Sequence, residues 1–195
     1  FHFPYCSQRC PYCNFTLTTA DIAHQDYLDA TLSEFNSRLD ELVSLGWTPQ
    51  PLHSVYIGGG TPGLWAPEQL KIFMRHIEAR LGFKDDIEIT LEANPGEVTR
   101  ALTQAWADIG INRLSLGVQS MRVDTLSRLG RNHHPDDVKR SIKMARQSKI
   151  QRINVDLMHG MYGEGVKEAI ADLESVLALN PSHISLYQLT IEPQT

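Results

Sequence analysis

The hydrophobic positions of this chain divide its first half into alternating helical and extended segments. Apolar residues recur at steps of four, three, four and three along Leu28–Leu42, which is the spacing of the buried stripe of an amphipathic helix. Gly46 ends this helix. The short run Ser54–Ile57 is rich in β-forming residues and is closed by three glycines, so it predicts a buried strand. A second helix is expected at Pro67–Leu81, with proline in its first turn and Gly82 after its end.

The same unit of strand and helix repeats along the rest of the chain. The pattern predicts strands at Glu88–Glu92, Arg113–Val118, Ile153–Leu157 and Ile184–Leu189, and helices near Val98–Ile109, Asp136–Ser148 and Gly165–Leu179. Successive strands are separated by about 30 residues, the length of a βαβ crossover unit. Such alternation predicts an α/β fold with a parallel sheet, either doubly wound or curved into a barrel.

Polar residues at the strand ends favour the barrel. Gly58–Thr61, Glu92, Gln119 and Asp156 each end or follow a predicted strand. Ligand sites of parallel sheets gather at this C-terminal edge. Four strands that deliver polar groups to one rim, with a cysteine-containing loop after a fifth strand, favour a partial (β/α) barrel around a shared cavity.

Composition and charge narrow the class of protein. The chain has 195 residues, of which 42% are apolar, enough to bury the core of one domain. The formal net charge is −5, and the lysines and arginines are scattered, so neither nucleic acid nor a charged membrane surface is an expected partner. No apolar run is long enough for a transmembrane segment, and no signal segment opens the chain.

The two ends indicate a fragment. The chain starts without Met at Phe1-His2-Phe3-Pro4, which resembles the end of a strand, and it stops soon after another strand-like segment. We therefore expect residues 1–195 to be one domain of a longer protein, truncated at both ends and lacking its C-terminal region.

Three closely spaced cysteines carry the most specific chemistry. Cys6, Cys10 and Cys13 form a C-x3-C-x2-C pattern and are the only cysteines in the chain. An odd number of thiols cannot pair completely as disulfides, and unpaired thiols favour a reducing compartment, here the cytoplasm. Three thiolates would leave a cubic iron–sulfur cluster one ligand short. A zinc site completed by His2 is the alternative, although structural zinc sites usually combine two separated pairs of ligands.

Several other polar residues are ambiguous when each is taken alone. Gly58-Gly59-Gly60-Thr61-Pro62 lacks the spacing of a Walker A or dinucleotide-binding loop, but it would let the backbone approach a ligand closely. Glu92 is most simply a solvated acid at a strand end, and Arg131 a member of a structural ion pair. Asp156 is more informative because it interrupts a run that should be buried on both faces. His133, His134 and His159 are assigned no role.

Taken together, these segments resemble the radical S-adenosylmethionine (SAM) proteins related to oxygen-independent coproporphyrinogen III oxidase. The resemblance covers essentially the whole chain. It is carried by His2-Phe3-Pro4-Tyr5-Cys6, Cys10-Pro11-Tyr12-Cys13, Gly58-Gly59-Gly60-Thr61-Pro62, Glu92-Ala93-Asn94-Pro95, Gly117-Val118-Gln119-Ser120 and Asp156-Leu157-Met158-His159-Gly160.

The resemblance implies a radical SAM core with a partial (β/α) barrel. It implies that Cys6, Cys10 and Cys13 hold a [4Fe–4S] cluster whose open iron binds SAM. An electron supplied to the cluster by a one-electron donor would then cleave the SAM. By the same resemblance the SAM site is lined by Tyr12, Gly59, Gly60, Thr61, Glu92, Gln119, Arg131 and Asp156. Some of these residues belong in the oxidase to a second SAM molecule.

One position separates two subgroups of this family. The oxidases carry a further cysteine two residues after the third cluster ligand, whereas the heme chaperones carry phenylalanine, and this chain has Cys13-Asn14-Phe15. The resemblance therefore favours a heme chaperone, which binds heme as cargo and passes it to an acceptor protein. The alternative is an oxygen-independent coproporphyrinogen III oxidase of porphyrin biosynthesis, which would decarboxylate its substrate oxidatively.

Overall fold

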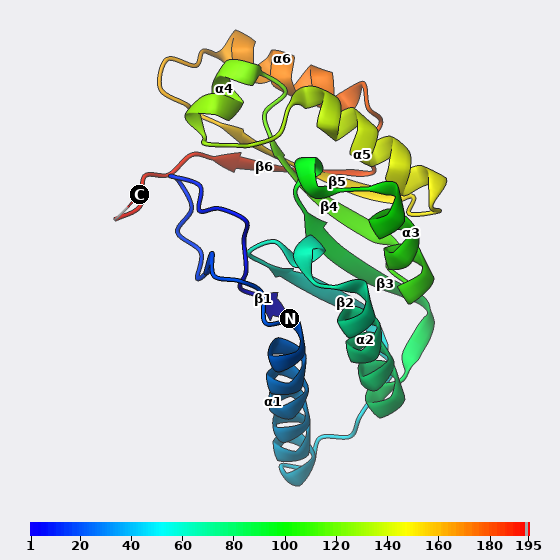
Figure 1. Ribbon diagram of the computed structural model, residues 1–195. Coiled ribbons are helices and arrows are strands. Elements are labelled where there is room, and N and C mark those ends of the chain that lie inside the picture. The colour runs from blue at the N-terminus through cyan, green and yellow to red at the C-terminus, as the bar shows by residue number, and fades with distance from the viewer. Residues whose placement is uncertain (194) are drawn as a thin grey trace.

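Parallel strands lie side by side in the order in which they occur along the chain (Figure 1). The computed structural model describes residues 1–193 and 195. Within this range the sheet consists of β1 (His2–Phe3), β2 (Leu52–Gly59), β3 (Phe83–Ala93), β4 (Arg113–Gln119), β5 (Arg152–His159) and β6 (His183–Gln188). In the part of the chain that the structure describes, β1 and β6 are the two edges of this sheet. The expected partial barrel with a parallel sheet is confirmed.

The helices lie along one side of the curved sheet, and the loop after β1 lies at the end toward which the strands run (Figure 1). The helices are α1 (His24–Ser44), α2 (Pro67–Leu81), α3 (Arg100–Ile109), α4 (Val123–Arg128), α5 (Pro135–Gln147) and α6 (Val166–Leu177), with short 3-10 turns η1 (Pro62–Leu64) and η2 (Pro95–Glu97). The five helices expected from periodicity are present, with ends shifted by a few residues. The pattern missed α4, because six residues are too short for a helical repeat to be recognised.

Local sequence signals explain several helix boundaries. The helix expected near Val98 begins at Arg100, because the Thr99 side chain accepts a hydrogen bond from the backbone N–H of Leu102 at 3.2 Å. Helix α3 ends at Gly110, which has a φ of +105°. His134 and Asp137 form a reciprocal cap at the start of α5.

The core lies between the sheet and the helices. Its centre consists of alternating strand residues that are almost fully buried, namely Ile57, Leu91, Leu114, Leu116, Ile153 and Val155. The helices add apolar side chains from their inner faces, including Phe73, Ile77, Trp106, Val138 and Val176. Because the outer strand face is filled by the helices, the opposite face at the strand ends is available for a site.

An aromatic cluster holds β1 in place. Phe3 is fully buried, stacks on Trp65 with ring centroids 5.6 Å apart, and meets Tyr27 edge-on at 5.1 Å. Because β1 has only two residues, this packing rather than an extended ladder anchors the chain at the start of the cysteine-containing loop.

No helix among the described residues combines the length and the apolar character needed to cross a membrane.

Candidate cluster and cofactor site

The three cysteines lie on a loop that leaves β1 and returns beside it. The backbone N–H of Thr18 donates to the carbonyl of Pro4 at 2.8 Å, and the N–H of Cys6 donates to the carbonyl of Thr18 at 2.9 Å. The N–H of Cys13 donates to the carbonyl of Cys10 at 3.0 Å, which forms a turn between the last two cysteines. This cysteine loop, residues 5–18, is therefore closed by hydrogen bonds between its two ends and contains a turn at Cys10–Cys13.

Two glycines at the end of β2, Gly59 and Gly60, allow this loop to approach the sheet. The N–H of Gly60 donates to the carbonyl of Phe3 at 2.7 Å, and a side chain on Gly60 would meet the Tyr5 carbonyl oxygen at 2.5 Å. Gly59 has a φ of +127°, and a side chain there would meet the Phe3 carbonyl oxygen at 2.7 Å. The glycines were expected to let a ligand approach closely; what approaches them in the structure is the backbone of the cysteine loop.

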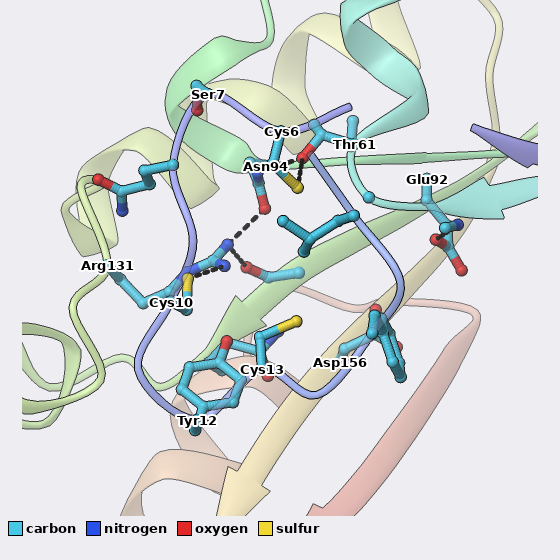
Figure 2. A pocket seen from close by; sticks show the side chains of 18 of the residues that line it. Cys6, Ser7, Cys10, Tyr12, Cys13, Thr61, Glu92, Asn94, Arg131 and Asp156 are labelled. Carbon is cyan, nitrogen blue, oxygen red and sulfur yellow. Dashed lines mark hydrogen bonds between the residues drawn. The ribbon is translucent and has the colours of Figure 1, made fainter. Parts of the chain in front are cut away.

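A cavity of about 470 Å³ lies between the loop and the C-terminal ends of the strands. This volume is within the range of small-molecule and cofactor sites. The cavity brings together every site residue proposed from the sequence, namely Cys6, Cys10, Tyr12, Cys13, Gly59, Gly60, Thr61, Glu92, Gln119, Arg131 and Asp156. Figure 2 shows that the labelled side chains come from the cysteine loop, from β3 and β5, and from the segments that follow β2, β3 and α4.

Two of the thiols have polar neighbours. Cys6 Sγ lies 3.3 Å from the hydroxyl oxygen of Thr61, and Nη1 of Arg131 lies 3.5 Å from Cys10 Sγ (Figure 2). Burial raises the pKa of the Cys6 thiol, and the hydrogen bond from Thr61 partly offsets this. No three His, Cys, Asp or Glu side chains in the described ranges 1–193 and 195 are grouped as a site for a single metal ion.

Asn94 links these neighbours and is not among the site residues predicted from the sequence. Its Nδ2 donates to Thr61 Oγ1 at 3.1 Å and to Glu97 Oε2 at 3.3 Å, and its Oδ1 accepts a hydrogen bond from Arg131. Glu97 in turn accepts a hydrogen bond from the Ser7 hydroxyl at 2.6 Å. The available signal was an asparagine just after a predicted strand, but two of its partners, Thr61 and Arg131, lie 33 and 37 residues away in the sequence.

Glu92 is not the solvated strand-end acid that the residue alone suggested. It is half-buried, and it accepts hydrogen bonds from the Tyr56 hydroxyl at 2.7 Å and from the Gly59 N–H at 3.0 Å. Burial raises the pKa of the carboxyl group, while these two hydrogen bonds lower it. Burial likewise raises the pKa of the Tyr56 phenol. Glu92 is therefore a half-buried carboxyl group that two hydrogen bonds hold in place at the cavity.

Asp156 is held by polar side chains of three neighbouring strands. Nδ2 of Asn154 lies 2.8 Å from Asp156 Oδ1, and the Ser115 hydroxyl lies 3.3 Å from Oδ2. Asn154 also donates to Ser185 at 3.0 Å. Burial raises the pKa of Asp156, and hydrogen bonds from Ser185, Asn154 and Ser115 oppose the increase. The interruption of the apolar run by Asp156 corresponds to a fixed carboxyl group at the cavity.

Among the described residues Arg131 forms no ion pair with a carboxylate, although a structural ion pair was the simplest expectation for this residue. Its Nη2 donates to the Gly117 carbonyl at 2.7 Å as well as to Asn94, and its buried Nε has no protein partner among the described residues. Burial raises the pKa of the neighbouring Tyr12 phenol. The guanidinium group therefore connects the cysteine loop to the ends of β3 and β4.

None of His133, His134 and His159 is among the described residues that line the cavity. His133 is buried, with Nε2 3.1 Å from the carbonyl oxygen of Val118, and burial lowers its pKa to about 4. His134 is exposed and accepts a hydrogen bond from the Asp136 N–H at 3.3 Å. Both side chains therefore have structural partners.

Comparison with known proteins decides the family. The sequence model of the Radical SAM superfamily matches residues 1–176. The chain belongs to the radical SAM superfamily. The family implies a [4Fe–4S] cluster and SAM, and the residues present fit both groups: three thiols lie on one loop, and the cavity beside them is lined by glycine backbone and by carboxylate, amide and guanidinium groups.

The relatives of this radical SAM chain include heme chaperones. It is 41% identical to "Heme chaperone HemW" of Haemophilus influenzae over 196 aligned residues, which cover 100% of this chain and 51% of that protein. It is 39% identical to HemW of Escherichia coli strain K12, with 100% and 50% covered. The chain thus spans about half the length of the curated relatives it matches.

A solved structure of the same superfamily supports the fold. The coproporphyrinogen III oxidase HemN from Escherichia coli superposes with a TM-score of 0.86 at 25% identity, covering 98% of this chain and 44% of HemN. The radical SAM core described above is therefore shared by a heme chaperone group and an oxidase. The resemblance stated from the motifs is confirmed.

Proposed function

We propose that the full-length protein is a radical SAM heme chaperone, which binds heme and transfers it to an acceptor protein. The observation that carries the proposal is Phe15, which lines the cavity two residues after Cys13. The oxidase subgroup is expected to have a further cysteine at this position. The similarity to HemW along the whole chain supports the same assignment.

The cavity suggests a role for each group of residues. Residues 1–195 would form the radical SAM core domain, in which Cys6, Cys10 and Cys13 hold the cluster. When bound, the cluster and SAM supply one-electron chemistry at the SAM sulfonium. The SAM contacts would be Tyr12, Gly59, Gly60, Thr61, Glu92, Gln119, Arg131 and Asp156.

The geometry supports distinct tasks within this set. Glu92, held by Tyr56 and Gly59, would accept hydrogen bonds from an ammonium or ribose hydroxyl group. Asp156, which lies on β5, would accept a hydrogen bond from a second polar group of the ligand. The glycine backbone leaves the approach to the cysteine loop free of side chains.

The proposal includes partners and a location. The partners would be heme or another porphyrin, a heme-acceptor protein and a one-electron donor. Nucleic acid is not among them, because the formal net charge is −5 and basic residues are scattered. We place the protein in the cytoplasm, where the reducing environment would keep the three thiols available to iron.

The second candidate is an oxygen-independent coproporphyrinogen III oxidase, which the superposition on HemN favours. The deciding experiment is an anaerobic assay of the full-length, cluster-reconstituted protein with coproporphyrinogen III, SAM and a reductant. Stable binding of heme without turnover of the porphyrinogen is the expected result. Formation of protoporphyrinogen IX would replace the chaperone proposal with the oxidase.

A further inference from the structure

The end of β4 contains a strained turn that points to a use for its central residue. Gln119 has a φ of +66°, and the N–H of Ser120 donates to the carbonyl of Val118 at 2.8 Å. This is a three-residue γ-turn of the rare, strained type with positive φ. The register between β4 and β5 shifts at the same place, between Gly117 and Gln119.

Gln119 differs from the other residues with this backbone conformation. In the described chain the remaining non-glycine residues with positive φ are Lys149 and Asn180, both exposed and both just after helices. Gln119 instead lines the cofactor cavity. Glycine would adopt a positive φ without strain, so glutamine at this position indicates that its side chain is used.

A buried carboxylate on the far side of the sheet holds this turn. Asp172 of α6 is 4% exposed, and its Oδ1 accepts a hydrogen bond from the Met121 N–H at 2.9 Å. Its Oδ2 accepts a hydrogen bond from the hydroxyl of Ser120, a side chain with no exposed surface. Ser120 Oγ also accepts from the Arg122 N–H at 3.0 Å. Of the three residues after Gln119, Ser120 and Met121 are thus hydrogen-bonded to Asp172, and Arg122 is hydrogen-bonded to Ser120.

The turn is also held on its other side. The carbonyl of Gly117 accepts the hydrogen bond from Arg131 Nη2 at 2.7 Å. Strained backbone persists only where its surroundings determine it from more than one direction. Here Arg131 fixes the residue two before Gln119, and Asp172 fixes the residues that follow it.

We infer that Asp172 and Ser120 are positioning residues, which hold the Gln119 side chain in the cavity for contact with bound SAM. This inference rests on the proposed function, in which the cavity binds SAM. Neither Asp172 nor Ser120 lines the cavity, so both act through the γ-turn. Nothing in the sequence pattern identifies Asp172, because it lies on the inner face of a helix 52 residues after Ser120.

The first test measures the affinity for SAM in the full-length, cluster-reconstituted protein under anaerobic conditions. Asp172→Ala should weaken SAM binding by roughly 10-fold, the lower end of losses seen when groups that orient a ligating side chain are removed. Asp172→Asn should restore most of the affinity, because its amide oxygen still accepts the Met121 N–H and its NH₂ group can donate to Ser120. Iron content should be equal in all variants.

Val176→Ala is the matched control. Val176 is fully buried on the same helix but has no polar side-chain atom that could hold the turn, so its truncation should lower the melting temperature and leave the affinity for SAM unchanged. If Asp172→Ala weakens SAM binding no more than Val176→Ala does, Asp172 has only a structural role. If the unmodified protein binds no SAM, the proposed function fails instead.

A second test does not depend on SAM. Gln119→Gly should relieve the strain in the turn, so Asp172→Ala should lower the melting temperature less in the Gln119→Gly background than in the unmodified protein. If Asp172→Ala lowers the melting temperature equally in the unmodified protein and in Gln119→Gly, the inference is contradicted. If Asp172→Ala does not fold, Ser120→Ala takes its place in both tests, since it removes one of the two hydrogen bonds to Asp172.

Discussion

The guanidinium group of Arg131 lies against the thiol of Cys10, with Nη1 3.5 Å from Sγ, although the two residues are 121 positions apart. The same side chain reaches Asn94 and the carbonyl of Gly117. A fixed positive charge beside a cluster ligand stabilises the more negative, reduced state of a cluster, and a hydrogen bond to the ligating sulfur acts in the same direction.

Replacing Arg131 with glutamine should therefore lower the reduction potential of the reconstituted cluster. The expected decrease is on the order of tens of millivolts, from the loss of one nearby charge and one hydrogen bond. The potential is measured by electron paramagnetic resonance during a redox titration without SAM. Arg128→Gln, an exposed site on α4, is the control. An unchanged potential at full iron content would show that Arg131 does not tune the cluster.

Each of Cys6, Cys10 and Cys13 is expected to be necessary for the cluster. Replacement of any one by alanine should remove the brown absorbance near 400 nm, a wavelength that holds roughly for clusters of this kind. Iron and sulfide analysis after anaerobic purification provides the measurement. Thr19→Ala, an exposed change just beyond the same loop, should keep the full iron content. Full iron in all three cysteine variants would rule out these residues as the ligands.

The raised pKa of Glu92 gives a pH-dependent prediction for the protein without SAM. Because burial raises this pKa, the folded protein holds the proton more tightly than the unfolded chain does. The contribution of Glu92 to the free energy of unfolding is fully present below the pKa that Glu92 has in the unfolded chain. It is lost as the pH rises through the higher pKa that Glu92 has in the folded protein. Glu92→Gln should therefore raise the melting temperature at pH 7 to 8, with a gain that shrinks toward pH 5.

The same change should weaken SAM binding roughly 10- to 100-fold, since a charge-assisted hydrogen bond worth about 1.5–3 kcal/mol is lost. Thermal unfolding across this pH range and equilibrium binding of SAM measure the two effects. Glu78→Gln, an exposed site on α2, should change neither. A melting temperature lower than that of the unmodified protein at every pH would contradict the burial argument for Glu92.

Two phenylalanines on either side of the cysteines should behave in opposite ways. Phe3 is fully buried in the aromatic cluster, so Phe3→Ala should cost about 3–5 kcal/mol of unfolding free energy. Phe15 is 66% exposed, and Phe15→Ala should change the unfolding free energy by no more than about 0.5 kcal/mol. Chemical denaturation of both variants provides the comparison. A large loss for Phe15→Ala would mean that Phe15 is packed in the full-length protein.

The sequence by itself determined the alternation of strands and helices and the chemistry of the cysteine loop. These features depend on neighbouring residues: the helical repeat of apolar side chains along Leu28–Leu42, the short β-forming runs, and the fixed spacing of three thiols. Polar residues at strand ends also predicted which groups would share the cavity, because the C-terminal ends of parallel strands meet at one edge of the sheet.

Only the tertiary structure decided which partners those polar groups have. The contacts of Glu92 with Tyr56, of Asn94 with Arg131 and of Ser120 with Asp172 join residues 36, 37 and 52 positions apart. Each depends on the register between strands and on how a helix crosses the sheet, which local periodicity does not contain. The strain at Gln119 is of the same kind, because a γ-turn with positive φ persists only when distant residues hold it.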